Sequence, residues 1–246
     1  MKRILTLVVA LVLSAGLYAQ KDVTKFLGIP VDGTKQAMIQ KLKAKGFTYN
    51  QQKDVLKGEF NGEQVEISVQ TKGNKVWRLA VSDVKARDEG QIKIRFNNLV
   101  RQFEKNGKYI PLKDSQTISD EEDISYGISI KEKQYEASFS QFSKDYFQNI
   151  DTLALQNLLK EEYARELKQI EEYYNRFTEE QWENPTEAMS ESLKKIEEWR
   201  SETIVEFAFG LLYKKLIWFT IGEDYGRYKI VMFYENGFNE ADGSDL

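Results

Sequence analysis

The stretch that decides the fold runs from Leu216 to Glu235 and reads Leu-Ile-Trp-Phe-Thr-Ile-Gly-Glu-Asp-Tyr-Gly-Arg-Tyr-Lys-Ile-Val-Met-Phe-Tyr-Glu. Two runs rich in β-branched and aromatic residues flank a polar break with two glycines, which is typical of a β-hairpin. Side chains alternate along a strand, so Tyr228 and Tyr234 fall on one face and Phe233 on the other. Strands that are apolar on both faces are usually covered on both faces. We therefore predict that this hairpin lies at the centre of its sheet.

Residues upstream of the hairpin predict a helix and three antiparallel strands. Thr34 is a suitable N-cap for the helix, and Gly46 ends it in the left-handed conformation common at helix C-termini. Strands are predicted at residues 55–60, 64–71 and 76–82. Asn61-Gly62, between the first two strands, is the strongest short signal for a hairpin. The residues expected to face the core are Val65, Ile67 and Val69 on the second strand and Trp77, Leu79 and Val81 on the third.

The next segment predicts a second helix followed by a second pair of strands. A buried helical stripe over residues 88–105 is formed by Ile92, Phe96, Leu99, Val100 and Phe103. Alternating apolar residues then predict one strand through Ile124, Tyr126, Ile128 and Ile130, and a return strand through Tyr135, Ala137 and Phe139.

From residue 143 to 213 the composition changes to long, charged helices. One helix is predicted from 152 to about 175, and Asn184-Pro185-Thr186-Glu187 predicts the start of another, with Asn184 as its cap. Residues 203–211 are rich in β-branched and aromatic residues, so a strand is the alternative there, but helical spacing continues to Tyr213 and favours a helix. These helices separate two predicted hairpins, so we predict that they are an insertion crossing over the sheet.

Together these elements predict an α+β fold in which antiparallel sheet packs against helices. A helix followed by antiparallel strands occurs twice, so two tandem units are one interpretation and a single α+β layer structure is the other. The corresponding domain boundaries are 20–106 and 107–246, unless the two form one continuous domain.

The N-terminus has the three-part pattern of a secretory signal peptide. Lys2 and Arg3 precede an apolar run from Ile4 to Leu13, and small residues lead to a cleavage site after Ala19. The apolar run is too short for a transmembrane anchor, and the chain has no cysteine to carry a lipid. We expect residues 1–19 to be removed and the remaining chain to be a soluble exported protein, either periplasmic or secreted.

The composition excludes several classes of function. The formal net charge is −4, which argues against nucleic acid and anionic membrane surfaces as partners. The chain has no histidine and no cysteine, which removes Ser-His-Asp and Cys-His catalysis, zinc sites with those ligands and histidine-bound haem. We recognise no catalytic motif and expect no cofactor and no metal site. The acidic C-terminal segment from Asn236 to Leu246 resembles calcium loops in composition but lacks their spacing.

The candidate binding residues are the aromatic and acidic residues of the hairpin, namely Trp218, Glu223, Asp224, Tyr225, Tyr228 and Tyr234. With Phe233, the aromatic residues could form a surface for a sugar or a peptide, but alternating aromatics are also what a buried sheet requires. The polar break at Gly222–Gly226 is the part expected to meet a partner. Paired carboxylates, either Glu223 with Asp224 or those between Asp120 and Asp123, are the alternative, since glycosidases need only two acids.

Two stretches resemble a group of uncharacterised exported proteins of Bacteroidetes-type bacteria. The first is Phe26-Leu-Gly-Ile-Pro-Val-Asp-Gly-Thr34 with the helix after it, and the second is Tyr228-Lys-Ile-Val-Met-Phe-Tyr-Glu-Asn236 with Asn239 and the ending Asp242-Gly-Ser-Asp-Leu246. The resemblance implies export and no particular chemistry. In architecture, a helix followed by three strands is similar to small periplasmic modules of the lactamase-inhibitor and outer-membrane-assembly type, which act by binding proteins.

The sequence therefore favours a binding or interaction module whose partner is a protein or a small ligand. A carboxylate-dependent hydrolase and a structural, envelope-associated protein are the alternatives.

Overall fold

The computed structural model describes residues 22–142 and 184–240, together with residues 168–169, 172–173, 175–178 and 180–181. Within the long helix near the end of the chain, the side chains of residues 193, 197, 199–201 and 203–208 lie outside this description. The predicted helix from 152 to about 175 falls almost wholly outside the described residues.

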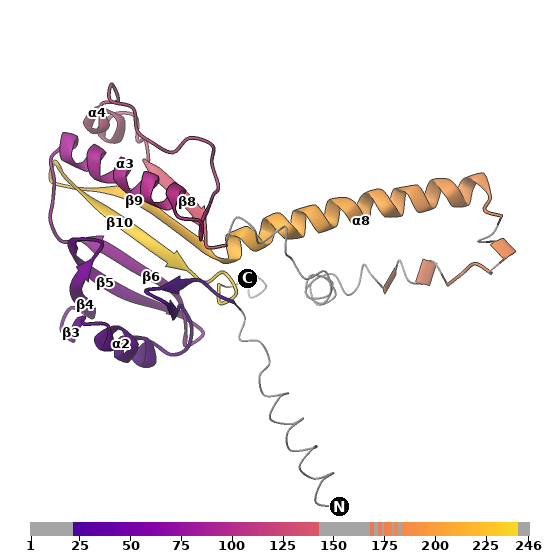
Figure 1. The fold of residues 1–246 in the computed structure, drawn as a ribbon, viewed down its shortest axis with the longest axis horizontal. Coiled ribbons are helices and arrows are strands. Elements are labelled where there is room, and N and C mark those ends of the chain that lie inside the picture. Colours follow the sequence, from indigo (N-terminus) through magenta and orange to yellow (C-terminus); the bar gives the residue numbers. More distant parts are fainter. Residues whose placement is uncertain are drawn as a thin grey trace, which may run out of the picture.

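The fold is α+β and is built on one eight-stranded antiparallel sheet (Figure 1). Its strand order is β3-β4-β5-β6-β10-β9-β8-β7, and β1 and β2 form a separate two-stranded sheet. The elements of the first half are β1 Lys25–Phe26, β2 Ile29–Pro30, α2 Lys35–Ala44, β3 Thr48–Asn50, β4 Val55–Phe60, β5 Glu63–Lys72 and β6 Lys75–Asp83. Those of the second half are α3 Glu89–Lys105, β7 Ile110–Pro111, α4 Ile124–Ser129, β8 Glu136–Ser140, α8 Glu187–Lys214, β9 Leu216–Asp224 and β10 Arg227–Glu235.

The core lies on one face of the sheet, under α2 and α3. The strand registers place one buried row across six strands, formed by Leu56, Ile67, Val81, Met232, Phe219 and Ala137. Both helices bury their apolar stripes on this face, through Met38, Ile39 and Leu42 of α2 and Ile92, Phe96, Leu99, Val100 and Phe103 of α3. A single core cluster therefore extends under both helices.

Each half of the sheet follows the same plan, a helix followed by four antiparallel strands. In the first half α2 precedes β3, β4, β5 and β6, and in the second α3 precedes β7, β8, β9 and β10. The last strands of the two halves, β6 and β10, pair with each other at the centre, with Val81 opposite Met232. The predicted hairpin is β9–β10, and its central position is confirmed.

Short-range chemistry explains most of the predicted boundaries. Thr34 and Asp88 cap α2 and α3 by accepting hydrogen bonds from Ala37 and Gln91 backbone N–H groups. The two-residue loops between adjacent strands all have positive φ at both residues, as a type I′ turn requires. Asn61-Gly62 supplies these angles between β4 and β5, as predicted.

The helix α8 is an insertion at the end of a hairpin. Ser140 and Leu216 are paired across β8 and β9, yet residues 141–215 separate them in sequence. The 28 residues of α8 correspond to about 42 Å of helix, and Figure 1 shows it extending away from the sheet as an arm. Its C-terminal turn is fixed to the sheet because the Ser140 hydroxyl donates to the carbonyl of Leu212. None of the helices in the described part of the chain is long and apolar enough to span a membrane.

The prediction of helix for residues 203–211 is confirmed, but its predicted start is wrong. Thr186, not Asn184, is the N-cap of α8, since the Thr186 side chain accepts a hydrogen bond from Met189 N–H. Pro185 therefore precedes the cap instead of occupying the first helical position.

The predicted strand at Ile124 is also wrong, because the segment is the short helix α4. Asp123 caps it by accepting from Tyr126 N–H, and the Glu89 carboxylate accepts from Ile124 N–H. Gly127 lets the helix approach Tyr135, since a Cβ at Gly127 would lie 2.1 Å from the Tyr135 hydroxyl oxygen. Apolar residues two and four positions apart fit a strand, but those four apart also share a helical face, and the caps decide between them.

Two predictions about side-chain direction need correction. Trp77 does not continue the buried face of Leu79, because the register shifts between Gln70 and Thr71 and Val76 is buried instead. The central hairpin is also fully buried on one face only. Trp218, Val231 and Phe233 on the other face are half-buried, so the apolar pattern on both faces did not require full burial on both.

Candidate binding groove

The structure separates the six candidate residues of the hairpin into three places. Tyr228 and Tyr234 are buried on the helix-covered face, and Trp218 is half-buried on the opposite face. Glu223, Asp224 and Tyr225 are exposed at the β9–β10 turn. The six therefore do not form one site.

Trp218 belongs to a cluster on the open face whose polar groups bond to one another. Its ring stacks on Phe233 with centroids 4.2 Å apart, and its indole N–H donates to the Glu235 carboxylate at 2.6 Å. The same carboxylate oxygen binds the Arg78 guanidinium at 2.6 Å, and that guanidinium lies 3.9 Å from the Trp77 ring centroid. These contacts rigidify the centre of the open face.

The β9–β10 turn exposes its side chains fully. Tyr225 is 100% exposed and has a φ of 51°, while the Glu223 carboxylate accepts a hydrogen bond from Gly226 N–H. Asp224 lies 3.7 Å from the Lys229 ammonium across the hairpin. Both acids thus have local partners, and this geometry holds the turn.

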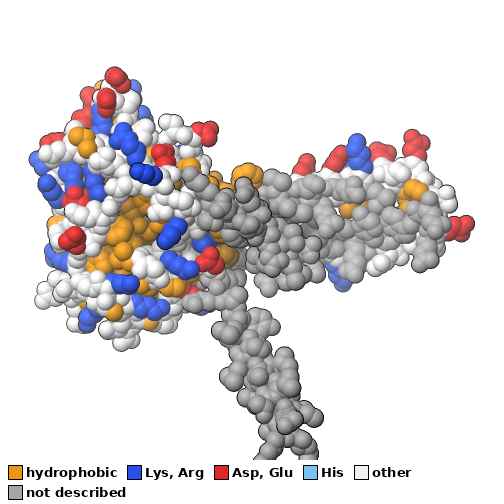
Figure 2. Space-filling model, viewed as in Figure 1, with side chains coloured by type: hydrophobic (Ala, Val, Ile, Leu, Met, Phe, Trp, Pro, Cys, Tyr) orange, Lys and Arg blue, Asp and Glu red, His pale blue; other side chains and the backbone are white. Residues whose placement is uncertain are grey.

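A groove opens between α3 and the first half of the sheet, above β10. Met232 and Tyr234 form its floor, and its two adjoining lobes have volumes of about 310 Å³ and about 560 Å³. Figure 2 shows hydrophobic side chains gathered in the middle of this face, with Lys and Arg side chains beside them on the side of the arm. The residues common to both lobes are Leu27, Phe60, Tyr109 and Tyr234. The apolar lobe adds Leu99, Phe103, Met232, Glu59, Asn61, Gln102 and Asn106, and the lysine lobe adds Asp22, Lys25, Gly28, Lys108, Gln141, Phe142 and Lys215.

Leu27 is the unusual residue of the groove. It occupies the first loop position of the β1–β2 turn with a φ of 51°, where asparagine, aspartate and glycine are preferred. A left-handed conformation costs an ordinary L-residue about 1–2 kcal/mol. The Leu27 side chain is also 40% exposed although it is apolar. A strained and exposed leucine that lines both lobes points to a role in binding.

Tyr234 is a second candidate contact at the centre of the groove. It is 3% exposed, and burial raises the pKa of its hydroxyl well above the ordinary value, with a smaller contribution from Tyr109. Its ring packs edge-on against Phe26, with centroids 4.9 Å apart. Among the described residues no group forms a hydrogen bond with this hydroxyl. Buried hydroxyls usually have a partner, so a bound molecule could supply one.

The apolar lobe is closed at its far end by a hydrogen bond. The Asn61 side-chain amide, in the β4–β5 turn, donates to the Gln102 side chain of α3 at 3.0 Å. Phe103 and Tyr109 pack edge to face with centroids 4.7 Å apart and stiffen the α3 wall. The lobe is therefore a short apolar channel with amide groups on its rim.

The lysine lobe is held by ion pairs at the base of the arm. The Asp22 carboxylate binds the Lys215 ammonium at 2.6 Å and the Lys25 ammonium at 3.0 Å. Burial lowers the pKa of Lys215, and the hydrogen bond from Asp22 opposes that shift only in part. The pKa of Asp22 is also lowered: burial raises it, and the bonds from Lys215 and Lys25 outweigh that effect. Both groups therefore stay charged at neutral pH.

A third pocket, of about 400 Å³, lies between β8 and the loop after β7 and contains Glu122 and Glu136. The Glu122 carboxylate binds the Lys133 ammonium at 2.7 Å and accepts from the Tyr135 hydroxyl, and these bonds lower its pKa. A general acid in a glycosidase needs a raised pKa, so this pair does not favour that chemistry. Within the described part of the chain no cluster of three acidic side chains could hold a metal ion.

The sequence analysis missed most of the groove. Leu27, Phe60 and Tyr109 come from three separate elements, and only Tyr234 of its shared residues was a candidate. A signal existed for Leu27, because Leu-Gly stands between Phe26 and Ile29 where a tight turn would normally contain Asn-Gly.

The two stretches behind the family resemblance lie in contact. The Asn236 side-chain amide donates to the carbonyl of Val31, and the Asn239 side-chain amide donates to Asp32 and to the carbonyl of Val76. The Thr24 hydroxyl donates to the carbonyl of Glu235. These polar residues thus fasten the end of β10 to the segment around β2. No family model, no curated protein and no solved structure matches this chain.

Proposed function

We propose that this protein is an interaction module that binds an apolar segment of a partner polypeptide in the groove above β10. The observation that carries the proposal is Leu27, an apolar residue that is both strained and exposed at the position shared by the two lobes. Neither property helps the isolated fold, since asparagine would relieve the strain and reduce the exposed apolar area.

The groove suits a polypeptide because apolar and amide groups alternate around it. Aromatic rings line its length, and the side chains of Asn61, Gln102 and Asn106 lie on the rim of the apolar lobe. Such amides can both donate to and accept from a peptide backbone. The free hydroxyl of Tyr234 adds a further polar group at the floor. Sites with mostly apolar walls and a few convergent polar groups are typical of specific binding.

We also propose that the protein acts outside the cytoplasm, after cleavage near Ala19. The basic start, the short apolar run and the small residues before Gln20 support this. N-terminal sequencing of the exported protein would identify the cleavage point.

The binding proposal can be tested by selecting a random dodecapeptide library on the full chain and measuring the dissociation constants of the recovered peptides. The Leu27→Asn variant is expected to bind them at least about tenfold more weakly, since burying a leucine contributes about 1.5–3 kcal/mol. The same variant is expected to be about 1 kcal/mol more stable to urea, because asparagine tolerates the left-handed angle. A more stable protein that binds less well cannot be explained by misfolding.

Tyr225→Asn is the matched control. Tyr225 also occupies the first position of a type I′ turn before a glycine, with a φ of 51°, but it lies outside the groove. It should gain similar stability and retain full binding. Recovered peptides that bind Leu27→Asn as tightly as the unchanged protein would refute the proposal.

A further inference from the structure

The charges around the groove are distributed unevenly along its length. Three lysines, Lys25, Lys108 and Lys215, line the lysine lobe, and Asp22 is its one acidic residue among the described residues. The apolar lobe has no lysine or arginine in its lining and contains Glu59. In a chain with a formal net charge of −4, this end of the groove is locally basic.

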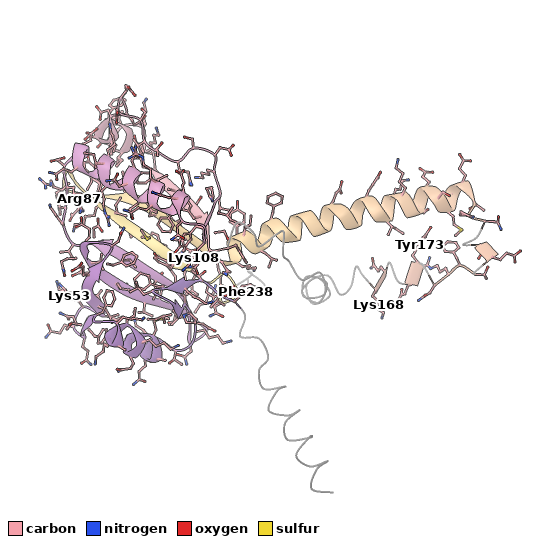
Figure 3. All side chains as sticks on the ribbon, viewed as in Figure 1. Lys53, Arg87, Lys108, Lys168, Tyr173 and Phe238 are labelled. Carbon is pink, nitrogen blue, oxygen red and sulfur yellow. The ribbon has the colours of Figure 1, made fainter. Side chains whose placement is uncertain are left out.

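Lys108 is the cation with no protein partner. Its ammonium forms no ion pair within the described part of the chain, and its side chain is exposed at the end of α3, where Figure 3 labels it on the side of the arm. Tyr109, the next residue, forms part of the wall shared by both lobes. Lys108 therefore stands where a ligand leaving the apolar lobe would pass.

The other two lysines share a single carboxylate. Lys215 is buried and rests over the Phe142 ring at 4.3 Å, whereas the Asp22 side chain that binds it is 61% exposed. Two cations and one anion leave this corner with an excess positive charge, before Lys108 is added. An incoming carboxylate would meet a favourable potential here.

We infer that the groove reads its ligand in one direction: the apolar part of the partner segment lies between Leu27 and Met232, and one or more acidic residues follow it into the lysine lobe. This inference rests on the proposed function. It specifies the partner segment as apolar residues followed by aspartate or glutamate. The opposite order would place the acids beside Glu59 and the closed Asn61–Gln102 end.

Matched peptides test the inference. A recovered peptide would be compared with three derivatives of it, in which the residues after the apolar part are two aspartates, two asparagines, or two aspartates moved in front of it. The derivative with following aspartates is expected to bind about 3–10-fold more tightly than the asparagine derivative, as exposed and partly buried ion pairs allow. This ratio should approach one near 1 M salt, where the screening length is about 3 Å.

Variants at the lysine lobe locate the effect. Lys108→Gln should remove about half of the preference in logarithmic terms, and Lys108→Glu should reverse it, with the asparagine derivative bound unchanged. Lys53→Gln is the control, because Lys53 is an exposed lysine before β4, away from the groove (Figure 3).

The outcomes separate this inference from the proposed function. Equal binding of the aspartate and asparagine derivatives, with both weakened by Leu27→Asn, would overturn the direction and leave the groove as a binding site. An acid preference that persists in Lys108→Glu would place the cation elsewhere and overturn the inference too. Binding of all derivatives that is insensitive to Leu27→Asn would overturn the proposed function itself.

Discussion

The two halves of the sheet have the same plan but differ in their connections. In the first half, β4, β5 and β6 follow one another through two-residue turns. In the second half, the loop with α4 separates β7 from β8, and residues 141–215 separate β8 from β9, although each pair lies side by side in the sheet. Because loop-closure cost grows only slowly with length, the same sheet tolerates a very long insertion at one hairpin.

The difference also explains where the groove lies. The helices α2 and α3 cover the outer parts of one face, and the groove runs between α3 and the first half, above the central strand β10. Its lysine lobe is completed by Phe142 and Lys215, the residues at the two ends of the insertion. The regular half thus supplies one wall, and the interrupted half supplies the charged end.

The largest expected effect comes from the buried row that joins the halves. Ile67 on β5 and Phe219 on β9 occupy equivalent positions, each one strand away from the central β6–β10 pair. Phe219→Ala should lower the free energy of unfolding by about 3–5 kcal/mol and Ile67→Ala by about 2–5 kcal/mol, because both side chains are fully buried.

Both losses should appear in one cooperative transition, measured by urea denaturation with far-ultraviolet circular dichroism and tryptophan fluorescence. The shared core cluster predicts coincident curves. A variant in which one half unfolds well before the other would show that the halves are separate domains.

The regular half was predictable because its signals are local. The alternation at Val65, Ile67 and Val69 has a single interpretation, and Asn61-Gly62 sets the hairpin between β4 and β5. The stripe on α3 was equally clear, since five apolar residues repeat at helical spacing and all are buried. The central hairpin was found for the same reason. Period and turn chemistry act within a few residues of each other.

The rest depended on contacts between distant residues. The segment after Ile124 fits both a strand and a helix, and what selects the helix includes Glu89, which lies 35 residues earlier. The short strands β3 and β7 have too few residues to show a period. The groove joins Leu27, Phe60, Tyr109 and Tyr234 only after the sheet has closed, so no local pattern marks it.

A smaller effect is expected at two glycines, one in each half. A Cβ at Gly58 would lie 2.6 Å from the Phe47 ring, and a Cβ at Gly237 would lie 2.9 Å from the Lys214 Cα. Alanine at either position should lower the free energy of unfolding by about 1–3 kcal/mol through overpacking. The neighbour of Gly58 is a side chain, whereas the neighbour of Gly237 is the backbone of α8.

Double variants separate these two cases. Phe47→Leu should recover part of the loss caused by Gly58→Ala, which a double-mutant cycle in urea would detect as favourable coupling. Lys214→Ala should recover little of the loss at Gly237, because the close atoms are the Lys214 Cα and the Tyr213 carbonyl oxygen. Equal recovery in the two pairs would mean that the arm yields as easily as a side chain does, and that its attachment to the sheet is loose.

The smallest effect concerns the acid dependence of the arm's attachment through Asp22. The pKa of this carboxyl is lowered in the folded protein, so its stabilising contribution is complete above the ordinary value of 3.8 and is lost as the pH falls through the lowered value. Asp22→Asn should therefore reduce stability at pH 7 by less than about 1 kcal/mol, given that the side chain is 61% exposed, and the difference from the unchanged protein should vanish near pH 2. The exposed Asp114, for which no ion pair occurs within the described part of the chain, provides the control Asp114→Asn. Urea titrations between pH 2 and 7, at about 0.1 M salt, measure both differences. A difference at Asp22 that persists unchanged at the lowest pH would show that the asparagine disturbs packing at the base of the arm, and that the ion pair with Lys215 contributes nothing to holding it.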